Sequence, residues 1–340
     1  MSERIIPISL IRQLFLLILI VVLGGLIFFE LLPYFSGILG AVTIYILTQG
    51  IMSRMLDRGI KGWLAATLIL IASVFVIILP SWLLVRLLGN KVQKLSKNSE
   101  QILAILKGKV DELEQFTGME LGSSLNVREI NTWISEQFQT LLGSTFNMII
   151  ALSVMYFILY YLLINTKRLK SIFLDYMPLS EQNVSLISHE ITEIVSSNAI
   201  GIPVVALLQG IVALIGFYIF GVPDPIFWFV ITVVGSMIPF VGTALGIVPV
   251  TILLFANGQN MQAIGILIYG VAVVGVTDNV FRVIIQNKLA KIHPLITLIG
   301  VIIGVPLFGF IGLIFGPLLI SLFMLVVKIY SKEYGESKEA

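Results

Sequence analysis

The sequence contains no cysteine and only two histidines, His189 and His293. Without cysteine, the chain forms no disulfide, offers no thiolate to a metal and has no cysteine nucleophile. Two histidines leave little for a histidine-rich metal site. Charge is scarce as well: charged residues make up 12%, whereas about a quarter of an ordinary soluble domain is charged. So few charges cannot cover the surface of a water-soluble protein of 340 residues.

Apolar residues are abundant, at 58%, and the mean hydropathy is +1.03. Lys and Arg number 21 against 19 Asp and Glu, a formal net charge of +2, so no basic excess indicates a nucleic-acid partner. Long uncharged runs recur along the chain, and a span of the bilayer needs about 20 apolar residues. We therefore predict an all-α, polytopic integral membrane protein with about eight hydrophobic units, whose first partner is the lipid bilayer.

One polar region with closely mixed charges interrupts the apolar runs. Its apolar residues recur at helical spacing, which predicts a helical insert outside the membrane. We expect five parts: N-terminal transmembrane helices at 1–85, the extracytoplasmic insert at 86–143, a fourth span with a cytoplasmic amphipathic helix at 144–198, a transport unit at 199–328, and a cytoplasmic tail at 329–340.

Lysine and arginine in the short loops predict the orientation. Basic residues precede the first span, follow the second and follow the fourth, so alternating spans place all three clusters inside. The clusters include Arg12, Arg58 and Lys167, and Lys328 then places the C-terminus inside as well. Both termini are therefore expected in the cytoplasm.

Two segments of the second half resemble each other: DPIFWFVITVVGSMIPFVGTALGIVPVTILL at 224–254 and HPLITLIGVIIGVPLFGFIGLIFGPLLISLF at 293–323. Each begins with a polar residue and Pro, and each has a central Pro-x-x-Gly. A broken helix exposes backbone groups that must meet protein or line a cavity, and matched breaks point to a transporter site. We predict hairpins, which could be re-entrant, at 225–257 and 294–327, with kinked spans as the alternative. Their broken backbones are expected at Pro239, Gly242, Pro306 and Gly309.

The string TDNVFR at 277–282 carries the sharpest chemical signal. Asp278 and Arg282 are four apart, so they share a helix face and can pair. An ionisable residue inside a membrane is a functional candidate by default, although an ion pair that anchors the helix end is the alternative. Asn279 could serve as a cation ligand. Gln209 lies mid-span, where it could bond a neighbouring helix or the substrate.

Several strings resemble the autoinducer-2 exporter (PerM) family. They are GIPVVALLQG, FGVPDPIFW, SMIPFVG, TDNVFR, HPLITLIGVIIG and FGFIGLIFGPLL. The resemblance implies a bacterial or archaeal inner-membrane transporter that exports the signal autoinducer-2 or exchanges Na⁺ or Li⁺ for H⁺, and that forms homo-oligomers. Asp278, Asn279 and Arg282 match the family's motif. Phe229 and Val283 depart from it, where glycine and proline often stand.

Other classes of protein fit the sequence less well. No Gly-x-x-x-x-Gly-Lys-Ser/Thr motif is present, so an ATP-driven pump is not expected. Asp278 has no obvious second carboxylate for an aspartyl protease, and no His-Glu-x-x-His motif indicates zinc. We therefore predict a secondary transporter of a small polar solute or a monovalent cation, not an enzyme. It needs no cofactor beyond H⁺ or Na⁺ as a coupling ion at Asp278. The alternatives are a passive channel and a structural or assembly protein.

Overall fold

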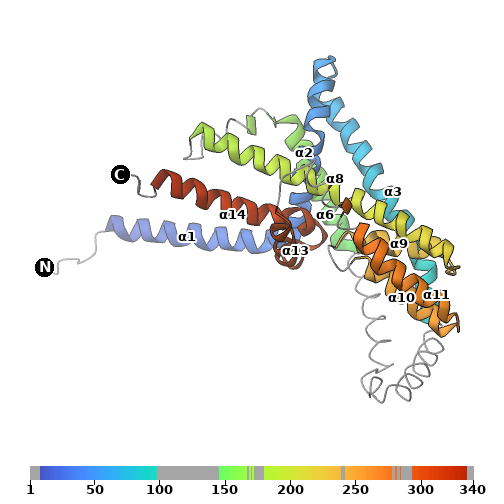
Figure 1. Cartoon of the computed structure of the whole chain (residues 1–340). Coiled ribbons are helices and arrows are strands. Elements are labelled where there is room, and N and C mark those ends of the chain that lie inside the picture. Colours follow the sequence, from blue (N-terminus) through green and yellow to red (C-terminus); the bar gives the residue numbers. More distant parts are fainter. Residues whose placement is uncertain are drawn as a thin grey trace.

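The computed structural model describes residues 8–97, 145–166, 168–169, 171, 180–238, 242–277, 280–281, 284 and 293–334. Within these residues the chain is helical and forms no strand (Figure 1). Four apolar helical stretches among them are long enough to cross a membrane: Ser9–Asp57, Glu181–Ile219, Asn260–Thr277 and Leu295–Lys332. The prediction of an all-α polytopic membrane protein is therefore confirmed. Of the predicted insert at 86–143, residues 86–97 continue helix α3, and residues 98–143 lie outside the described residues.

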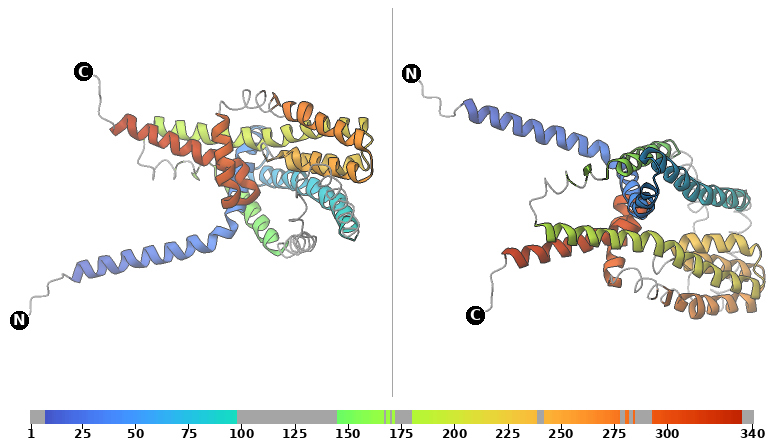
Figure 2. Two further views of the ribbon diagram at one scale, coloured as in Figure 1. Left: turned by 60° about the horizontal axis from the view of Figure 1, so that its bottom comes forward. Right: turned by 90° about the horizontal axis from the view of Figure 1, so that it is seen from above.

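The N-terminal helices are α1 (Ile8–Leu31), α2 (Phe35–Asp57), α3 (Gly62–Lys97) and α6 (Thr145–Ile164), with a short 3₁₀ turn, η1 (Leu32–Tyr34), between α1 and α2. Helix α1 projects from the rest with its apolar side chains exposed (Figure 2). Helices α2 and α6 run parallel, because Gly37 lies against Ala151 and Gly40 against Met155. Ala41, Leu159 and Leu163 are central to the apolar cluster that joins α2, α3 and α6.

Helix α8 (Glu181–Ile219) connects the parts of the molecule. The sequence predicts an amphipathic helix that ends near 198 and a separate span after it, but the structure has one continuous helix of 39 residues. At 1.5 Å per residue it is about 58 Å long, so its first half extends the span rather than lying flat beside it. Pro203 lies inside the helix without ending it, because the surrounding turns are buried against neighbouring helices.

The second half of the chain forms two helical hairpins. The first consists of α9 (Pro225–Ser236) and α10 (Ala244–Ala256), and it is followed by α11 (Asn260–Tyr269) and the π-helical turn η2 (Gly270–Val274). The second consists of α13 (Pro294–Phe308), the 3₁₀ turn η3 (Gly309–Ile311) and α14 (Gly312–Tyr334). An apolar cluster that includes Phe217, Leu254 and Ile266 holds α8, α10 and α11 together.

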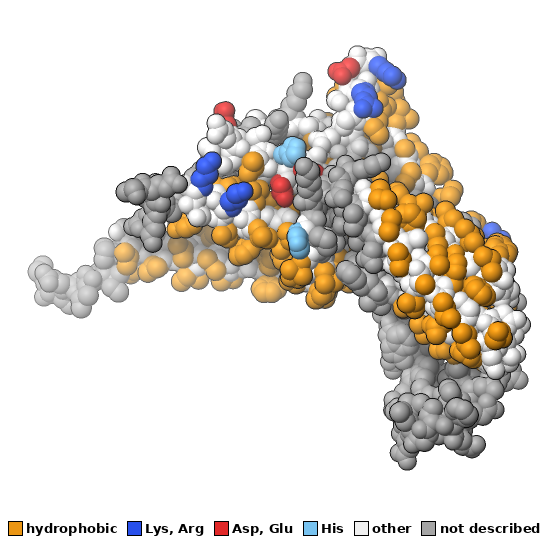
Figure 3. All heavy atoms as spheres, in the orientation of Figure 1, with side chains coloured by type: hydrophobic (Ala, Val, Ile, Leu, Met, Phe, Trp, Pro, Cys, Tyr) orange, Lys and Arg blue, Asp and Glu red, His pale blue; other side chains and the backbone are white. Residues whose placement is uncertain are grey.

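The start of α8 and the ends of α1 and α14 that bear the chain termini project toward the same side (Figures 1 and 2). The outer surface of the α9–α11 region is covered with hydrophobic side chains, whereas charged side chains collect near the α2–α3 turn and along the outer parts of α8 and α14 (Figure 3). Exposure of so broad an apolar surface to water is unfavourable. We therefore expect this surface to contact the lipid of a membrane.

Candidate functional site

Four of the predicted site residues lie outside the described residues: Asp278, Asn279, Arg282 and Pro239. Their roles stay predictions. The helix that leads to the TDNVFR motif is nevertheless described, up to Thr277. It contains the π-helical turn η2, and Thr277 Oγ1 donates to the Val274 carbonyl at 2.9 Å. Single π-turns inside helices are frequent at functional sites, so the distortion precedes the motif directly.

Gln209 lies on the buried face of α8, where 1% of the residue is exposed. Its neighbour Gly210 packs against the side chains of Phe229 and Val233, so this level of α8 faces α9. Among the described residues, neither Oε1 nor Nε2 of Gln209 has a hydrogen-bond partner. Leaving a buried polar group unsatisfied costs about 1–3 kcal/mol. The helix-to-helix hydrogen bond that the sequence allowed is therefore not formed in this structure.

Ser236 is the second buried polar residue without a partner in this region, and the sequence analysis missed it. It ends α9, 3% of it is exposed, and its Oγ makes no hydrogen bond. Ser236 follows Val233 by three residues, so it lies about one helical turn further along α9 from the level of Gly210. Its position in the sequence beside the predicted Pro-x-x-Gly break could have identified Ser236 as a candidate site residue.

The first hairpin closes through direct contact between backbones. Gly235 lies against the carbonyl of Gly242, and Gly246 lies against Thr232. A Cβ at either end of these contacts would meet neighbouring atoms, so only glycine lets the two helices approach this closely. Gly242, a predicted break residue, is thus buried in the turn that brings Ser236 to the base of α10.

The second hairpin repeats this construction. Gly300 lies against Gly316 and Pro317, and Gly304 lies against Gly312. Gly309, a predicted break residue, follows the last residue of α13 with a φ of 63°, a backbone conformation that residues other than glycine rarely adopt. Pro306 lies inside the last turn of α13 rather than in the break itself. Both segments are therefore antiparallel helical hairpins, and their re-entry into the membrane stays a prediction.

Helix α8 contacts the second hairpin and α11 through hydrogen bonds and apolar packing. Asn198 Nδ2 donates to the Ile314 carbonyl of α14 at 3.3 Å, and Ile194 packs in the cluster that includes Phe315. Further along α8, the hydroxyl of Tyr269 donates to the Val212 carbonyl at 2.9 Å. Helix α8 therefore contacts α9 through Gly210 as well as α11 and α14.

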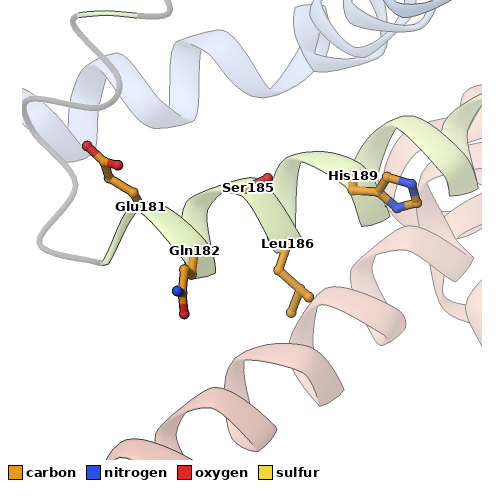
Figure 4. Close-up of a pocket in the computed structure, with 5 residues that line it drawn as sticks. All are labelled: Glu181, Gln182, Ser185, Leu186 and His189. Atoms are coloured by element: carbon orange, nitrogen blue, oxygen red, sulfur yellow. The ribbon is translucent and has the colours of Figure 1, made fainter.

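A separate hollow of about 640 Å³ lies on the outer half of α8. It is lined by Glu181, Gln182, Ser185, Leu186 and His189, and it is open to the surroundings (Figure 4). His189 Nδ1 lies 3.4 Å from a Glu193 carboxylate oxygen. Among the described residues no three acidic or histidine side chains gather to hold a metal. The hollow therefore lies on the first half of α8, outside the segment 199–328 for which a transport unit is predicted.

The sequence of the chain matches a known family of proteins. The sequence model described as "AI-2E family transporter" matches residues 16–332, nearly the whole chain. The chain belongs to the AI-2E transporter family. This match confirms the resemblance drawn from the sequence. The family and the apolar helices together indicate a multi-pass membrane transporter.

Relatives within the AI-2E family occur in distant prokaryotes. A protein of Aquifex aeolicus is 23% identical over 313 residues, which cover 87% of this chain and 89% of that protein. Rv1101c of Mycobacterium tuberculosis is 25% identical over 61% of this chain and 54% of its own length. YdiK of Escherichia coli is 32% identical over 36% of this chain and 33% of its own. All three carry the name "Putative transport protein".

Proposed function

We propose that this AI-2E family protein is a secondary transporter that moves a small polar solute, such as a signal molecule, or exchanges Na⁺ or Li⁺ for H⁺. Transport proceeds by alternating access around the two hairpins. No ATP-binding loop occurs in the sequence, so the driving force is an ion or solute gradient. The protein acts without an enzymatic step.

The observation that carries this proposal is the pair of similar hairpins seated on one long helix. Helices α9 and α10 have 12 and 13 residues, which correspond to about 18 and 20 Å. The bilayer core is about 30 Å thick, so neither helix spans it alone. Short, interrupted helices in matching halves are typical of secondary transporters, where substrate binds near the repeat interface.

Asp278 is the coupling residue in this scheme. Its carboxylate binds H⁺ or Na⁺ in turn, and Asn279 and Arg282 adjust its charge state. The π-helical turn η2 directly before the motif supports this role, because π-turns recur at functional positions. The N-terminal helices α1, α2, α3 and α6 form a scaffold and supply the contacts of a homo-oligomer.

The proposed location is the bacterial or archaeal cell membrane, with both termini in the cytoplasm. The start of α8, the start of α1 and the end of α14 lie toward one side of the molecule (Figure 2), in agreement with the basic clusters at all three places. The parallel course of α2 and α6 also supports this arrangement, because the charge rule gives both helices the same direction.

Reconstitution in liposomes that contain a trapped pH-sensitive dye tests the proposal. A pulse of Na⁺ or Li⁺ outside is expected to change the internal pH, and Asp278→Asn is expected to abolish the change without impairing folding or insertion. Asp224→Asn is the matched control, because Asp224 is an exposed carboxylate in the turn before α9. It should keep the parental response.

An unchanged response in Asp278→Asn would remove Asp278 from the coupling step. A correctly inserted parent protein that gives no cation response would exclude cation/proton exchange. Uptake assays with uncharged organic solutes would then test the remaining form of the proposal.

A further inference from the structure

Gln209 and Ser236 differ from the other buried polar residues around them. Thr232 Oγ1 donates to the Trp228 carbonyl at 2.7 Å, and Thr251 Oγ1 donates to the Ile247 carbonyl at 2.9 Å. These hydroxyls are satisfied within their own helices, as is usual for threonine in a membrane helix. Gln209 and Ser236 instead present three polar atoms without a partner on the two facing helices α8 and α9.

The polar atoms of this pair include both kinds of hydrogen-bonding group. Gln209 Oε1 accepts, Gln209 Nε2 donates, and Ser236 Oγ does either. A bare cation would bind the oxygens and leave the Nε2 hydrogens buried without an acceptor. A hydroxyl or amide group satisfies both ends, because it can donate to Oε1 and accept from Nε2. Apart from Asp224 in the exposed turn before α9, no charged residue occurs between 194 and 277 in the sequence, so the helices around the pair offer no counter-ion to a charged ligand.

We propose that Gln209 and Ser236 form a recognition site for an uncharged solute that carries a hydroxyl or amide group, separate from the cation site at Asp278. The inference rests on the proposed transport function and assigns solute and coupling ion to different places. Phe229 and Val233 cover Gly210 beside the pair, so solute enters when α9 moves away from α8. The conformation described here is the closed one with respect to this site.

The absence of cysteine makes a direct test possible. Ser236→Cys and Gln209→Cys each introduce a single thiol. Ala213→Cys is the matched control, because Ala213 lies one turn beyond Gln209 on α8 and is fully buried in an apolar cluster. The variants are reconstituted in proteoliposomes and treated with 2-aminoethyl methanethiosulfonate, which reacts with the thiolate in a hydrated environment.

The thiols at 236 and 209 are expected to react roughly tenfold faster than the thiol at 213, because only a site that admits polar molecules favours the thiolate. Glycerol or urea should slow both reactions, and NaCl at equal osmolarity should not. Equal rates at all three positions would overturn the proposal. Protection of the thiols by NaCl but not by glycerol or urea would show that the pair is a cation site instead. Faster labelling at 236 and 209 without protection by glycerol or urea would show that the pair is hydrated but does not recognise a solute, and this result would also overturn the proposal.

Folding is controlled separately. Each variant must elute from size-exclusion chromatography as the parent does, and Ser236→Ala provides a second variant that keeps the fold if the new thiol disturbs it. Ser236→Ala is expected to slow glycerol uptake, measured by light scattering. Unchanged glycerol uptake in Ser236→Ala would overturn the proposal. Labelling needs no transport, so a parent without any transport response would contradict the proposed function alone.

Discussion

At Gln209, the side chain that would best stabilise the fold differs from the side chain that the proposed transport function requires. Its side chain occupies a fully buried position on α8, where an apolar residue of the same length would pack without loss. The unsatisfied amide therefore lowers the stability of the closed conformation. Residues at functional sites commonly carry such a stability deficit, because their polar groups are arranged for a ligand rather than for the fold.

Gln209→Met is expected to raise the free energy of unfolding by about 1–3 kcal/mol, because it removes the buried unsatisfied amide at nearly constant volume. The thermal unfolding midpoint in detergent measures this. Asn198→Leu is the comparison: the Asn198 amide donates to the Ile314 carbonyl, so its loss should lower the midpoint. A lower midpoint in Gln209→Met would mean that the amide is bonded within the fold and has a structural role.

At the scale of elements, the hairpins depend on glycine at their contact points. In α13–α14 the helices touch at two levels, Gly300 with Gly316 and Gly304 with Gly312. In α9–α10 the equivalent contacts are Gly235 with Gly242 and Thr232 with Gly246. Small residues of this kind let membrane helices approach closely where apolar side chains give no net driving force in lipid. Each hairpin is thus a tightly packed unit.

Gly304→Ala is expected to destabilise the protein by about 1–3 kcal/mol, because its Cβ would meet the backbone of Gly312 and Gly316 and force the helices apart. The control is Gly25→Ala in α1, where nothing lies within 4 Å of the added atom. Alanine is also favoured over glycine in a helix by about 1 kcal/mol. The control should therefore unfold at the parental temperature or above, and equal effects of the two substitutions would contradict the close packing.

At the scale of the whole molecule, α8 determines how the parts are related. Its first half lies beside α14 on the side toward which the chain termini project, and its second half carries α9 and α11 (Figure 1). Because the helix is continuous, Ser180 and Phe220 lie at opposite ends of one rod of about 58 Å. The turn after α10 then lies at the same end as the turn before α9, because the two helices are antiparallel.

Single cysteines at Ser180 and Asn257 are expected to lie on opposite sides of the membrane. A membrane-impermeant maleimide applied to intact cells should label Asn257→Cys and leave Ser180→Cys unlabelled until the cells are opened. Both residues are at or near the ends of described helices and Asn257 is exposed, so the substitutions leave the packing intact. Labelling of Ser180→Cys on intact cells would invert the topology, and protection of both would indicate that α9 and α10 cross the membrane as kinked spans.

The Pro and Gly pattern predicted a hairpin in each segment, and glycine contacts close both hairpins in the structure, while their re-entry into the membrane stays a prediction. The prediction of a helix end near 198 was wrong: it rested on the change from an amphipathic pattern to an uncharged run. The helix continues through this change, and through Pro203, because Asn198 and Val205 are buried against neighbouring helices. Burial of a whole helix face outweighs the loss of one backbone hydrogen bond.

Composition by itself determined that this is an all-α membrane protein, because too few charges remain to cover a soluble surface, and the motif strings by themselves predicted the family. Only the tertiary structure decided that both hairpins pack on one helix and that Gln209 of α8 and Ser236 of α9 are buried without partners among the described residues. The reason is physical: hydropathy depends on residue type alone, whereas the satisfaction of a polar atom depends on what lies opposite it in space.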